Sequence, residues 1–97
     1  MIRSFADGAT EDLFNGVDSR RVRRACPLDL WPVARRKLTQ LNRVRGLQEL
    51  RIPPGNRLER LRGNRAGQHS IRINDQYRVC FRWEGGYADE VEVSDYH

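Results

Sequence analysis

Lysine and cysteine are scarce in this sequence, and long hydrophobic runs are absent. Lys37 is the only lysine among 18 basic residues. The cysteines, Cys26 and Cys80, form no CxxC pair and the histidines show no paired spacing, so we expect neither a disulfide scaffold nor a metal or other cofactor. No apolar run reaches the length of a membrane-spanning helix. Because acids soon follow the N-terminal residues, we expect no secretory signal and a cytoplasmic protein without membrane contact.

The positive charge predicts a polyanionic partner. The formal net charge is +5 over 97 residues, which we expect to form a single domain, 1–97, with a small core. Guanidinium groups bind phosphate bidentately and stack on bases. Residues 51–82 contain eight arginines and two acids, whereas residues 84–97 contain five acids and no lysine or arginine. GC-rich codons also favour arginine over lysine, so the total number of arginines is weak evidence of function. The uneven distribution of charge along the sequence indicates nucleic-acid binding more strongly.

The first half of the sequence predicts one short strand and two helices. Residues 2–5 alternate as in a strand, and a short helix through 11–14 is capped by Asp7 or Thr10 and ended by a glycine. A longer helix is expected over 29–45, with Gly46 as its stop. Its core-facing stripe consists of apolar residues at three- to four-residue spacing, namely Leu30, Ala34, Leu38 and Leu41.

Between these helices lies an arginine-rich segment at about 18–28. It contains little apolar surface and carries Pro27 near its end. We therefore expect a mobile, irregular loop there. Its arginines are either a solvated charge run or a binding element, and the sequence leaves both open.

The second half predicts four strands separated by turns, at about 57–62, 68–74, 77–83 and 87–94. The expected fold class is α+β: an N-terminal strand and two helices packed on a mainly antiparallel sheet of four to five strands. In the third of these strands, apolar residues alternate with basic ones, so one face is apolar and the other basic.

The basic face of this sheet is expected to be uncovered and to cradle a nucleic-acid strand. The arginines expected on it are Arg72, Arg78 and Arg82. The alternative is that these arginines pair with Glu90 and Glu92 on the neighbouring strand, since cross-strand charge pairs are common. His69 is in phase with the inward-facing isoleucines of its strand, which favours a structural role.

The last three residues are Asp95, Tyr96 and His97, an acid, a phenol and an imidazole in a row. An imidazole titrates near neutral pH, so His97 is the strongest candidate for proton transfer. With a basic surface that holds phosphate beside it, this tail indicates chemistry on RNA. The alternative is that a polar chain end arises by chance.

Several segments resemble HigB-type toxins, the plasmid-maintenance "killer" branch of the RelE/ParE superfamily of toxin–antitoxin systems. They are residues 53–59 (PPGNRLE), 61–65 (LRGNR), 67–78 (GQHSIRINDQYR) and 95–97 (DYH). The resemblance implies a RelE-like fold and a metal-independent, ribosome-dependent mRNA endonuclease (an mRNA interferase). It also implies a HigA-type helix-turn-helix antitoxin, through which the complex would contact operator DNA.

The resemblance further implies roles for particular residues. The catalytic set it implies is His97, Asp95, Tyr96, Arg78, Arg62 and Glu59, and the RNA-binding set is Arg57, Arg65, Arg72 and Arg82. Some family members carry a histidine where this chain has Glu59. That carboxylate is either a general base or an ion-pair partner of Arg60, and both readings stay open.

Other functions remain as alternatives. A ParE-like gyrase poison shares the fold but needs no proton-transfer groups. A non-catalytic nucleic-acid-binding module needs only basic charge and aromatic residues. A folded but weakly active toxin is also compatible with Glu59 in place of histidine.

Overall fold

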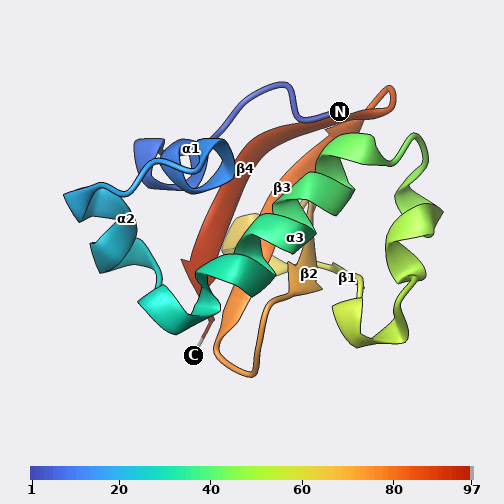
Figure 1. The fold of residues 1–97 in the computed structure, drawn as a ribbon. Helices are drawn as coiled ribbons and strands as arrows, with labels where there is room; N and C mark the ends of the chain where they lie inside the picture. The colour runs from blue at the N-terminus through green and yellow to red at the C-terminus, as the bar shows by residue number, and fades with distance from the viewer. Residues whose placement is uncertain (97) are drawn as a thin grey trace.

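Within residues 1–96, which the computed structural model describes, three α-helices and a four-stranded antiparallel sheet form two layers (Figure 1). The strands lie in chain order and are β1 (Glu59–Arg60), β2 (Gln68–Arg72), β3 (Tyr77–Glu84) and β4 (Tyr87–Asp95). The α-helices are α1 (Gly8–Asn15), α2 (Arg20–Ala25) and α3 (Trp31–Arg43). Short 3-10 helices are η1 (Leu28–Leu30), η2 (Leu47–Arg51), η3 (Pro54–Asn56) and η4 (Gly63–Arg65). The predicted α+β two-layer class is confirmed.

The N-terminal segment runs parallel to β4 without forming a regular strand. Ile2 forms an isolated bridge with Ala88, and Phe5 forms one with Val91. The Arg3 amide donates to the Ala88 carbonyl at 2.8 Å. The predicted first strand is therefore reduced to isolated parallel bridges along the edge of an otherwise antiparallel sheet.

Helix α3 packs its apolar stripe on the inner face of the sheet, where it crosses β3 and β4 (Figure 1). Ala34, Leu38 and Leu41 are fully buried, as their spacing predicts. Val79 and Phe81 of β3 are buried in the same core cluster. Burying each such large apolar side chain contributes about 1.5–3 kcal/mol, so this interface holds the two layers together.

Helix α3 begins later and ends earlier than the predicted range 29–45. Its first turn is preceded by η1 and includes Pro32. Val44 adopts an extended backbone conformation and ends the helix, so Gly46 is not its stop. Gly46 instead precedes η2, where its amide donates to the Glu49 carboxylate at 2.7 Å.

The arginine-rich segment at 18–28 is not irregular, which corrects the prediction. Ser19 caps α2 by accepting a hydrogen bond from the Val22 amide at 3.3 Å. Val22 and Cys26 lie four residues apart and are both buried. This apolar pair at positions i and i+4 packs the segment into the core, which its highly charged composition did not indicate. The mobility expected of this segment remains a prediction.

Two of the four arginines of α2 are paired with carboxylates at close range. Arg21 donates to Asp12 at 2.6 Å, and Arg23 pairs with Asp18 at 2.7 Å. The same Asp12 carboxylate accepts from Ser19 at 2.8 Å, so α1 and the start of α2 are tied together. These pairs are largely exposed and contribute little stability, about 0–1 kcal/mol each. Arg20 and Arg24 form no ion pair within residues 1–96.

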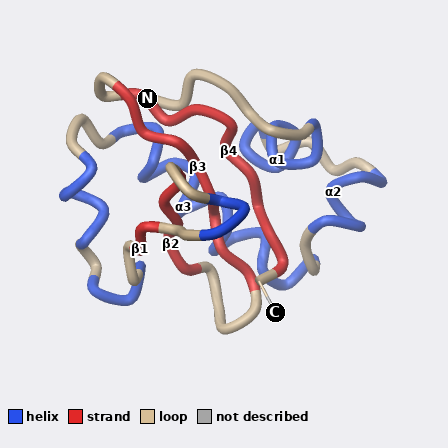
Figure 2. The backbone as a smooth tube through the Cα atoms, turned by 180° about the vertical axis from the view of Figure 1, so that it is seen from behind, coloured by secondary structure: helices blue, strands red, loops and turns tan. Residues whose placement is uncertain are grey.

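The outer face of the sheet is partly covered, which corrects the prediction of an uncovered basic face. The chain between β1 and β2, with η4, folds over the sheet on the side away from α3 (Figure 2). Ser70 and Cys80, which are paired across β2 and β3, are both fully buried. Covered outer positions of this kind make a shielded environment in which a cation is less screened than on open surface.

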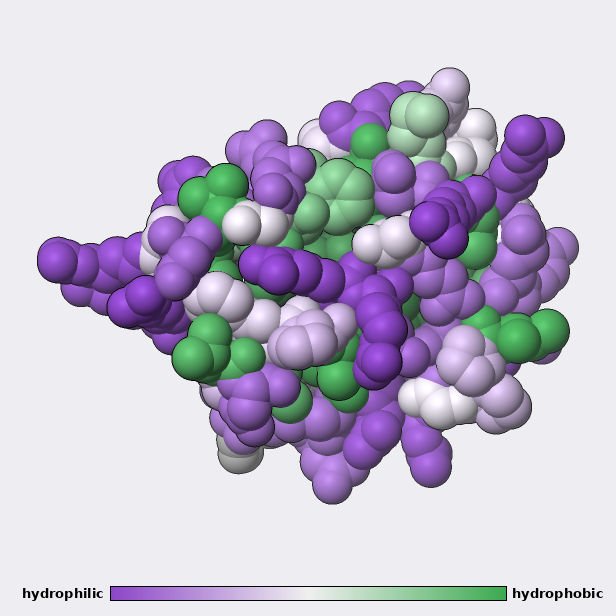
Figure 3. All heavy atoms as spheres, in the orientation of Figure 1, coloured by the Kyte–Doolittle hydropathy of each residue, from purple (hydrophilic) through white to green (hydrophobic). Residues whose placement is uncertain are grey.

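The surface on the α3 side is mainly hydrophilic, and its hydrophobic side chains form separate small patches (Figure 3). Leu28 and Ile52 are the most exposed large apolar residues of the described chain, at 68% and 72%. No helix within residues 1–96 is long and apolar enough to cross a membrane.

Candidate functional site

Arg78 of β3 is a nearly buried cation held by neutral oxygen atoms. Its Nε donates to Ser70 Oγ at 2.6 Å, and its Nη2 donates to the Arg57 carbonyl at 2.6 Å. The residue is 9% exposed. The nearest carboxylate oxygen, on Glu59, lies 3.9 Å from Nη2, which is beyond hydrogen-bond distance. The positive charge of Arg78 is therefore shielded from water and only weakly compensated.

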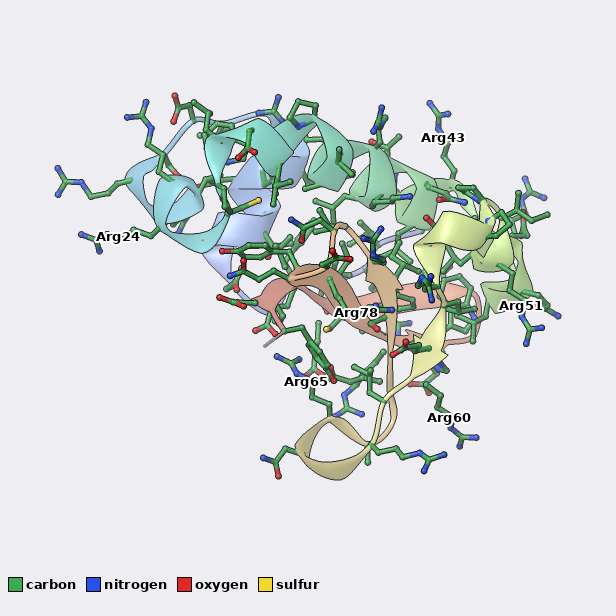
Figure 4. The ribbon with its side chains drawn as sticks, turned by 90° about the horizontal axis from the view of Figure 1, so that it is seen from below. Arg24, Arg43, Arg51, Arg60, Arg65 and Arg78 are labelled. Carbon is green, nitrogen blue, oxygen red and sulfur yellow. The ribbon has the colours of Figure 1, made fainter. Side chains whose placement is uncertain are left out.

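One guanidinium nitrogen of Arg78, Nη1, has no hydrogen bond within residues 1–96. No buried side-chain nitrogen or oxygen in that range lacks a partner, so Nη1 reaches solvent. Figure 4 shows Arg78 close against the strands, whereas Arg24, Arg43 and Arg51 project away from the molecule. An anion that approached Nη1 would meet a fixed donor in a partly desolvated setting, which strengthens the interaction.

A shallow pocket of about 290 Å³ lies where the end of β4 meets the η4 loop. We call it the terminal pocket, and its lining residues are Arg62, Asn64, Arg65, Asp95 and Tyr96. Four of these were predicted site residues from two distant parts of the sequence. The pocket thus brings two arginines to an acid and a phenol, next to the chain end.

Arg65 is the best-fixed side chain of the terminal pocket. Its guanidinium donates to Glu92 at 2.7 Å, to Ser94 Oγ at 2.8 Å and to Gln68 at 3.0 Å. The hydrogen bond to Glu92 raises the pKa of Arg65. Burial raises the pKa of Glu92, but the hydrogen bonds from Ser94 and Arg65 outweigh burial and bring that pKa below its ordinary value. The two groups therefore stay charged together.

The paired strands β3 and β4 connect Arg78 to the terminal pocket. Ser94 is the direct partner of Arg78 across β3 and β4, and its hydroxyl is bonded to Arg65. Cys80 lies near both arginines, whose charges each lower the pKa of its thiol. Burial has the largest effect and raises the pKa of Cys80, so Cys80 stays a neutral thiol.

The turn between β2 and β3 holds the end of the described chain. The Tyr96 amide donates to the Gln76 carbonyl at 2.6 Å, and the Gln76 side chain donates to Asp95 at 3.1 Å. Tyr96 is 41% exposed, so its ring remains available for contact. His97 lies outside the described residues.

A family model described as the RelE-like toxin of type II toxin–antitoxin system HigB matches residues 3–97. The chain belongs to the HigB family. It is 41% identical over 88 residues to Toxin HigB-1 of Vibrio cholerae serotype O1, covering 91% of this chain and 90% of that protein. It is 38% identical over 65 residues to an uncharacterized protein of Haemophilus influenzae, covering 67% of this chain and 64% of that one. The predicted resemblance is confirmed.

A solved structure shows the wider fold of this HigB-family toxin. The chain aligns with a chain from the YoeB–YefM complex of Staphylococcus aureus at a TM-score of 0.54, covering 100% of this chain and 98% of that chain. The sequence identity is 14%, so the likeness concerns the fold alone.

The structure of this HigB-family chain separates the predicted arginines into different situations. Arg72 lies directly opposite Arg78 but is paired with Asp75 at 2.5 Å. Arg82 is paired with Glu90 at 2.6 Å. For Arg82 the alternative of cross-strand pairing therefore holds, whereas Arg78 has no such partner within hydrogen-bond distance.

Glu59 and Arg57, both predicted site residues, lie next to Arg78. Glu59 of β1 lies near Arg78 rather than in an ion pair with Arg60. Its side chain is 54% exposed, so the carboxylate is open to solvent beside the cation. Arg57 reaches Arg78 through its backbone carbonyl, while its side chain is exposed.

Sequence reasoning missed Ser70, Ser94 and Gln76, which hold the charged residues of this HigB-family site in place. Small polar residues on strands carry no periodic signal of their own. Only the register of β2 against β3 reveals that Ser70 lies under the Arg78 side chain. His69, predicted to be structural, lies against Phe81 in a tilted arrangement with ring centroids 6.0 Å apart, and burial lowers the pKa of His69.

Proposed function

We propose that this HigB-family toxin is a metal-independent endoribonuclease that cuts mRNA in the ribosomal A site and so inhibits translation. The observation that carries the proposal is the position of the shielded Arg78 cation beside the terminal pocket. Cleavage of a phosphodiester needs cations where charge develops on phosphorus and proton-transfer groups within reach of the reacting oxygens. Two observations support the proposal: the Glu59 carboxylate lies near Arg78, and Arg62 lines the terminal pocket together with Asp95 and Tyr96.

The proposed reaction is an internal attack within the RNA. The ribose 2′-oxygen forms a bond to the adjacent phosphorus as a base removes its proton. The bond from phosphorus to the 5′-oxygen of the next nucleotide breaks, and an acid gives that oxygen a proton. The products are a 2′,3′-cyclic phosphate and a free 5′-hydroxyl.

We assign proton transfer to the end of the chain. His97 is the principal candidate because an imidazole both accepts and donates a proton near neutral pH. Asp95 and Tyr96 orient it or share the transfer. Glu59 is the second candidate base, since its exposed carboxylate lies 3.9 Å from Arg78, where a phosphate held by that arginine would be within reach.

We assign charge stabilisation to Arg78 and Arg62. Arg78 presents Nη1 to solvent, and no hydrogen bond or ion pair within residues 1–96 engages the Arg62 guanidinium on the rim of the terminal pocket. RNA on either side of the cut would contact Arg65 and Arg72, with Arg82 further out. The carboxylates that already pair with Arg65, Arg72 and Arg82 reduce what each contributes.

The proposed partners follow from the toxin–antitoxin family. We propose a HigA-type helix-turn-helix antitoxin that keeps the toxin from the ribosome and carries it to operator DNA. The aligned YoeB chain comes from a complex with YefM, which provides a parallel for a protein partner. The proposed place of action is the cytoplasm, where translating ribosomes are found.

The test is a map of RNA 5′ ends on a defined mRNA incubated with the purified chain, with and without translating ribosomes. We expect discrete cuts in register with codons that appear only with ribosomes and leave a 5′-hydroxyl. His97→Ala and Arg78→Ala should abolish cutting while ribosomes still bind. Arg43→Ala, which removes a charge from an exposed arginine at the end of α3, is the matched control and should cut normally.

Each other outcome identifies a competing function. Cuts without ribosomes would indicate a free ribonuclease that uses the same residues. No cuts, together with gyrase-dependent DNA breaks, would replace the proposal with a gyrase poison. Ribosome or RNA binding without cuts, unchanged in His97→Ala, would leave a non-catalytic binding module.

A further inference from the structure

Arg78 is held on two sides by groups to which no function has been assigned. Ser70 is fully buried, and its only role visible in the side-chain contacts of the described chain is to accept the Arg78 Nε hydrogen bond at 2.6 Å. The second acceptor is the carbonyl of Arg57 at 2.6 Å. With Nε and Nη2 both engaged, the guanidinium plane cannot turn, and Nη1 points in one direction.

The Arg57 carbonyl reaches Arg78 because Arg57 adopts a left-handed backbone conformation. Its φ is 46° and its ψ is 57°, at the residue that ends η3. A residue with a Cβ is disfavoured there, whereas glycine is not. Such a conformation persists in a non-glycine residue only when its surroundings impose it, and it often occurs at functional sites.

The residue before Arg57 supplies that constraint. The Asn56 side chain is fully buried and donates to Gln40 at 2.9 Å and to the Leu50 carbonyl at 3.1 Å. Lys37, the only lysine of the chain, donates to the Asn56 side-chain oxygen from α3. The chain is thus anchored to α3 directly before Arg57, and the anchor sets the direction of the next carbonyl.

We propose that Ser70 and the Arg57 backbone are positioning residues that aim Arg78 at the RNA phosphate, and that Arg57 acts through its carbonyl rather than through its guanidinium. This inference rests on the proposed ribonuclease function and identifies how its main cation is oriented. Lys37 and Asn56 support the arrangement from behind. Donors fixed before the reaction stabilise developing charge without having to reorganise, so loss of the fixation lowers turnover more than binding.

The first experiment compares Arg57→Gly with Arg57→Ala in the ribosome-dependent cleavage assay. Glycine removes the side chain but accepts the backbone conformation, so Arg57→Gly should cut within about twofold of the wild type. Alanine removes the same side chain and is strained at this φ, so Arg57→Ala should be the weaker enzyme. Arg51→Ala, which removes a charge from another exposed arginine nearby in sequence, is the control and should equal wild type. Equal, severe losses in both Arg57 variants would show that the guanidinium matters and would overturn the proposal.

The second experiment removes the other acceptor. Ser70→Ala should lower kcat by about tenfold to a hundredfold, because a misplaced group costs up to that much, while KM and ribosome binding change little. Ser70→Thr keeps the hydroxyl and should recover part of the loss, whereas Ser70→Val, with the same shape as threonine, should not. A loss confined to KM, or no loss, would overturn the positioning role.

A measurement without substrate separates this inference from the proposed function. The Arg78 Nε–H signal in the ¹⁵N NMR spectrum of the full chain should exchange slowly with water, and Ser70→Ala should make it exchange fast. Fast exchange in the wild type would refute the fixed guanidinium even if the protein cuts RNA. Slow exchange in a wild-type protein that never cuts RNA would confirm the fixed guanidinium of Arg78. It would also refute the ribonuclease proposal, and with it the catalytic role proposed for Ser70 and the Arg57 carbonyl.

Discussion

Replacing Glu92 by glutamine tests whether the ion pair with Arg65 organises the terminal pocket. The side chains of Arg65 and Glu92 are 31% and 29% exposed, so the pair is neither a surface ion pair nor a buried one. Arg65 would keep hydrogen bonds to Ser94 and Gln68 but lose the only carboxylate bonded to it in the described chain. The variant therefore removes charge and leaves shape nearly unchanged.

The expected magnitude lies between two limits. Exposed ion pairs contribute about 0.2–1 kcal/mol, and hydrogen bonds to charged groups about 1.5–3 kcal/mol. For a pair about one third exposed, we expect Glu92→Gln to lower the free energy of unfolding by about 1–1.5 kcal/mol at pH 7. For a domain of this size, a loss of 1 kcal/mol lowers Tm by about 4–8 °C.

Acid should remove the difference between the two proteins. The folded-state pKa of Glu92 lies below its ordinary value of 4.5, so its charge stabilises the fold above that value. As the pH falls through the folded-state pKa, wild type loses this contribution and Glu92→Gln does not. The gap in the free energy of unfolding, measured by urea denaturation, should therefore close in acid.

A double-mutant cycle provides the refuting result. Arg65→Met, Glu92→Gln and the double variant give the coupling energy between the two side chains. We expect about 1 kcal/mol of coupling at pH 7 and almost none in acid. A coupling near zero at pH 7, or a stability gap that does not depend on pH, would show that the pair does not organise the pocket.

The other predictions concern the core, the phosphate cation and the end of the chain. Leu38→Ala should lower the free energy of unfolding by about 2–5 kcal/mol in urea denaturation, because Leu38 is fully buried between the layers; a loss under 1 kcal/mol would contradict the packing. Arg78→Lys should fold normally but lose most cleavage, since an ammonium cannot bond Ser70, the Arg57 carbonyl and a phosphate in one plane. Cleavage at the wild-type rate would show that a guanidinium held in a fixed orientation is not needed. A tag appended directly after His97 should reduce cleavage relative to the same tag at Met1, and equal rates would remove the chain end from the site.

The sequence predicted the layers because they depend on periodicity. Leu38 and Leu41 recur at helical spacing, and Val79 and Phe81 recur at every second position of a strand. The sequence therefore indicated which face of each element is buried. The prediction of an irregular loop at 18–28 was wrong because it relied on the charged composition of the segment and not on its helix-capping residue. Ser19 followed by the buried pair Val22 and Cys26 is enough to set a six-residue helix once α1 supplies Asp12 as a partner.

The candidate site was only partly predictable, since its geometry depends on contacts between distant segments. The residue types at 95–97 indicated proton transfer, and the arginines indicated phosphate binding, from the sequence alone. That η4 folds over the outer face, and that Ser70 and the Arg57 carbonyl converge on Arg78, required strand register and one left-handed residue. Nothing in local spacing distinguishes Arg78 from Arg82, which lies on the same strand and pairs with Glu90.

The contrast between Arg78 and Arg82 explains why the net charge is a poor guide to this site. Arg82 meets a carboxylate at 2.6 Å on open surface, so water and Glu90 together screen it. Arg78 meets only neutral oxygens at the same distance and is 9% exposed. Because a partly desolvated charge whose nearest carboxylate lies 3.9 Å away gains more from an arriving anion, the phosphate should bind at Arg78 even though most arginines of the chain are more accessible.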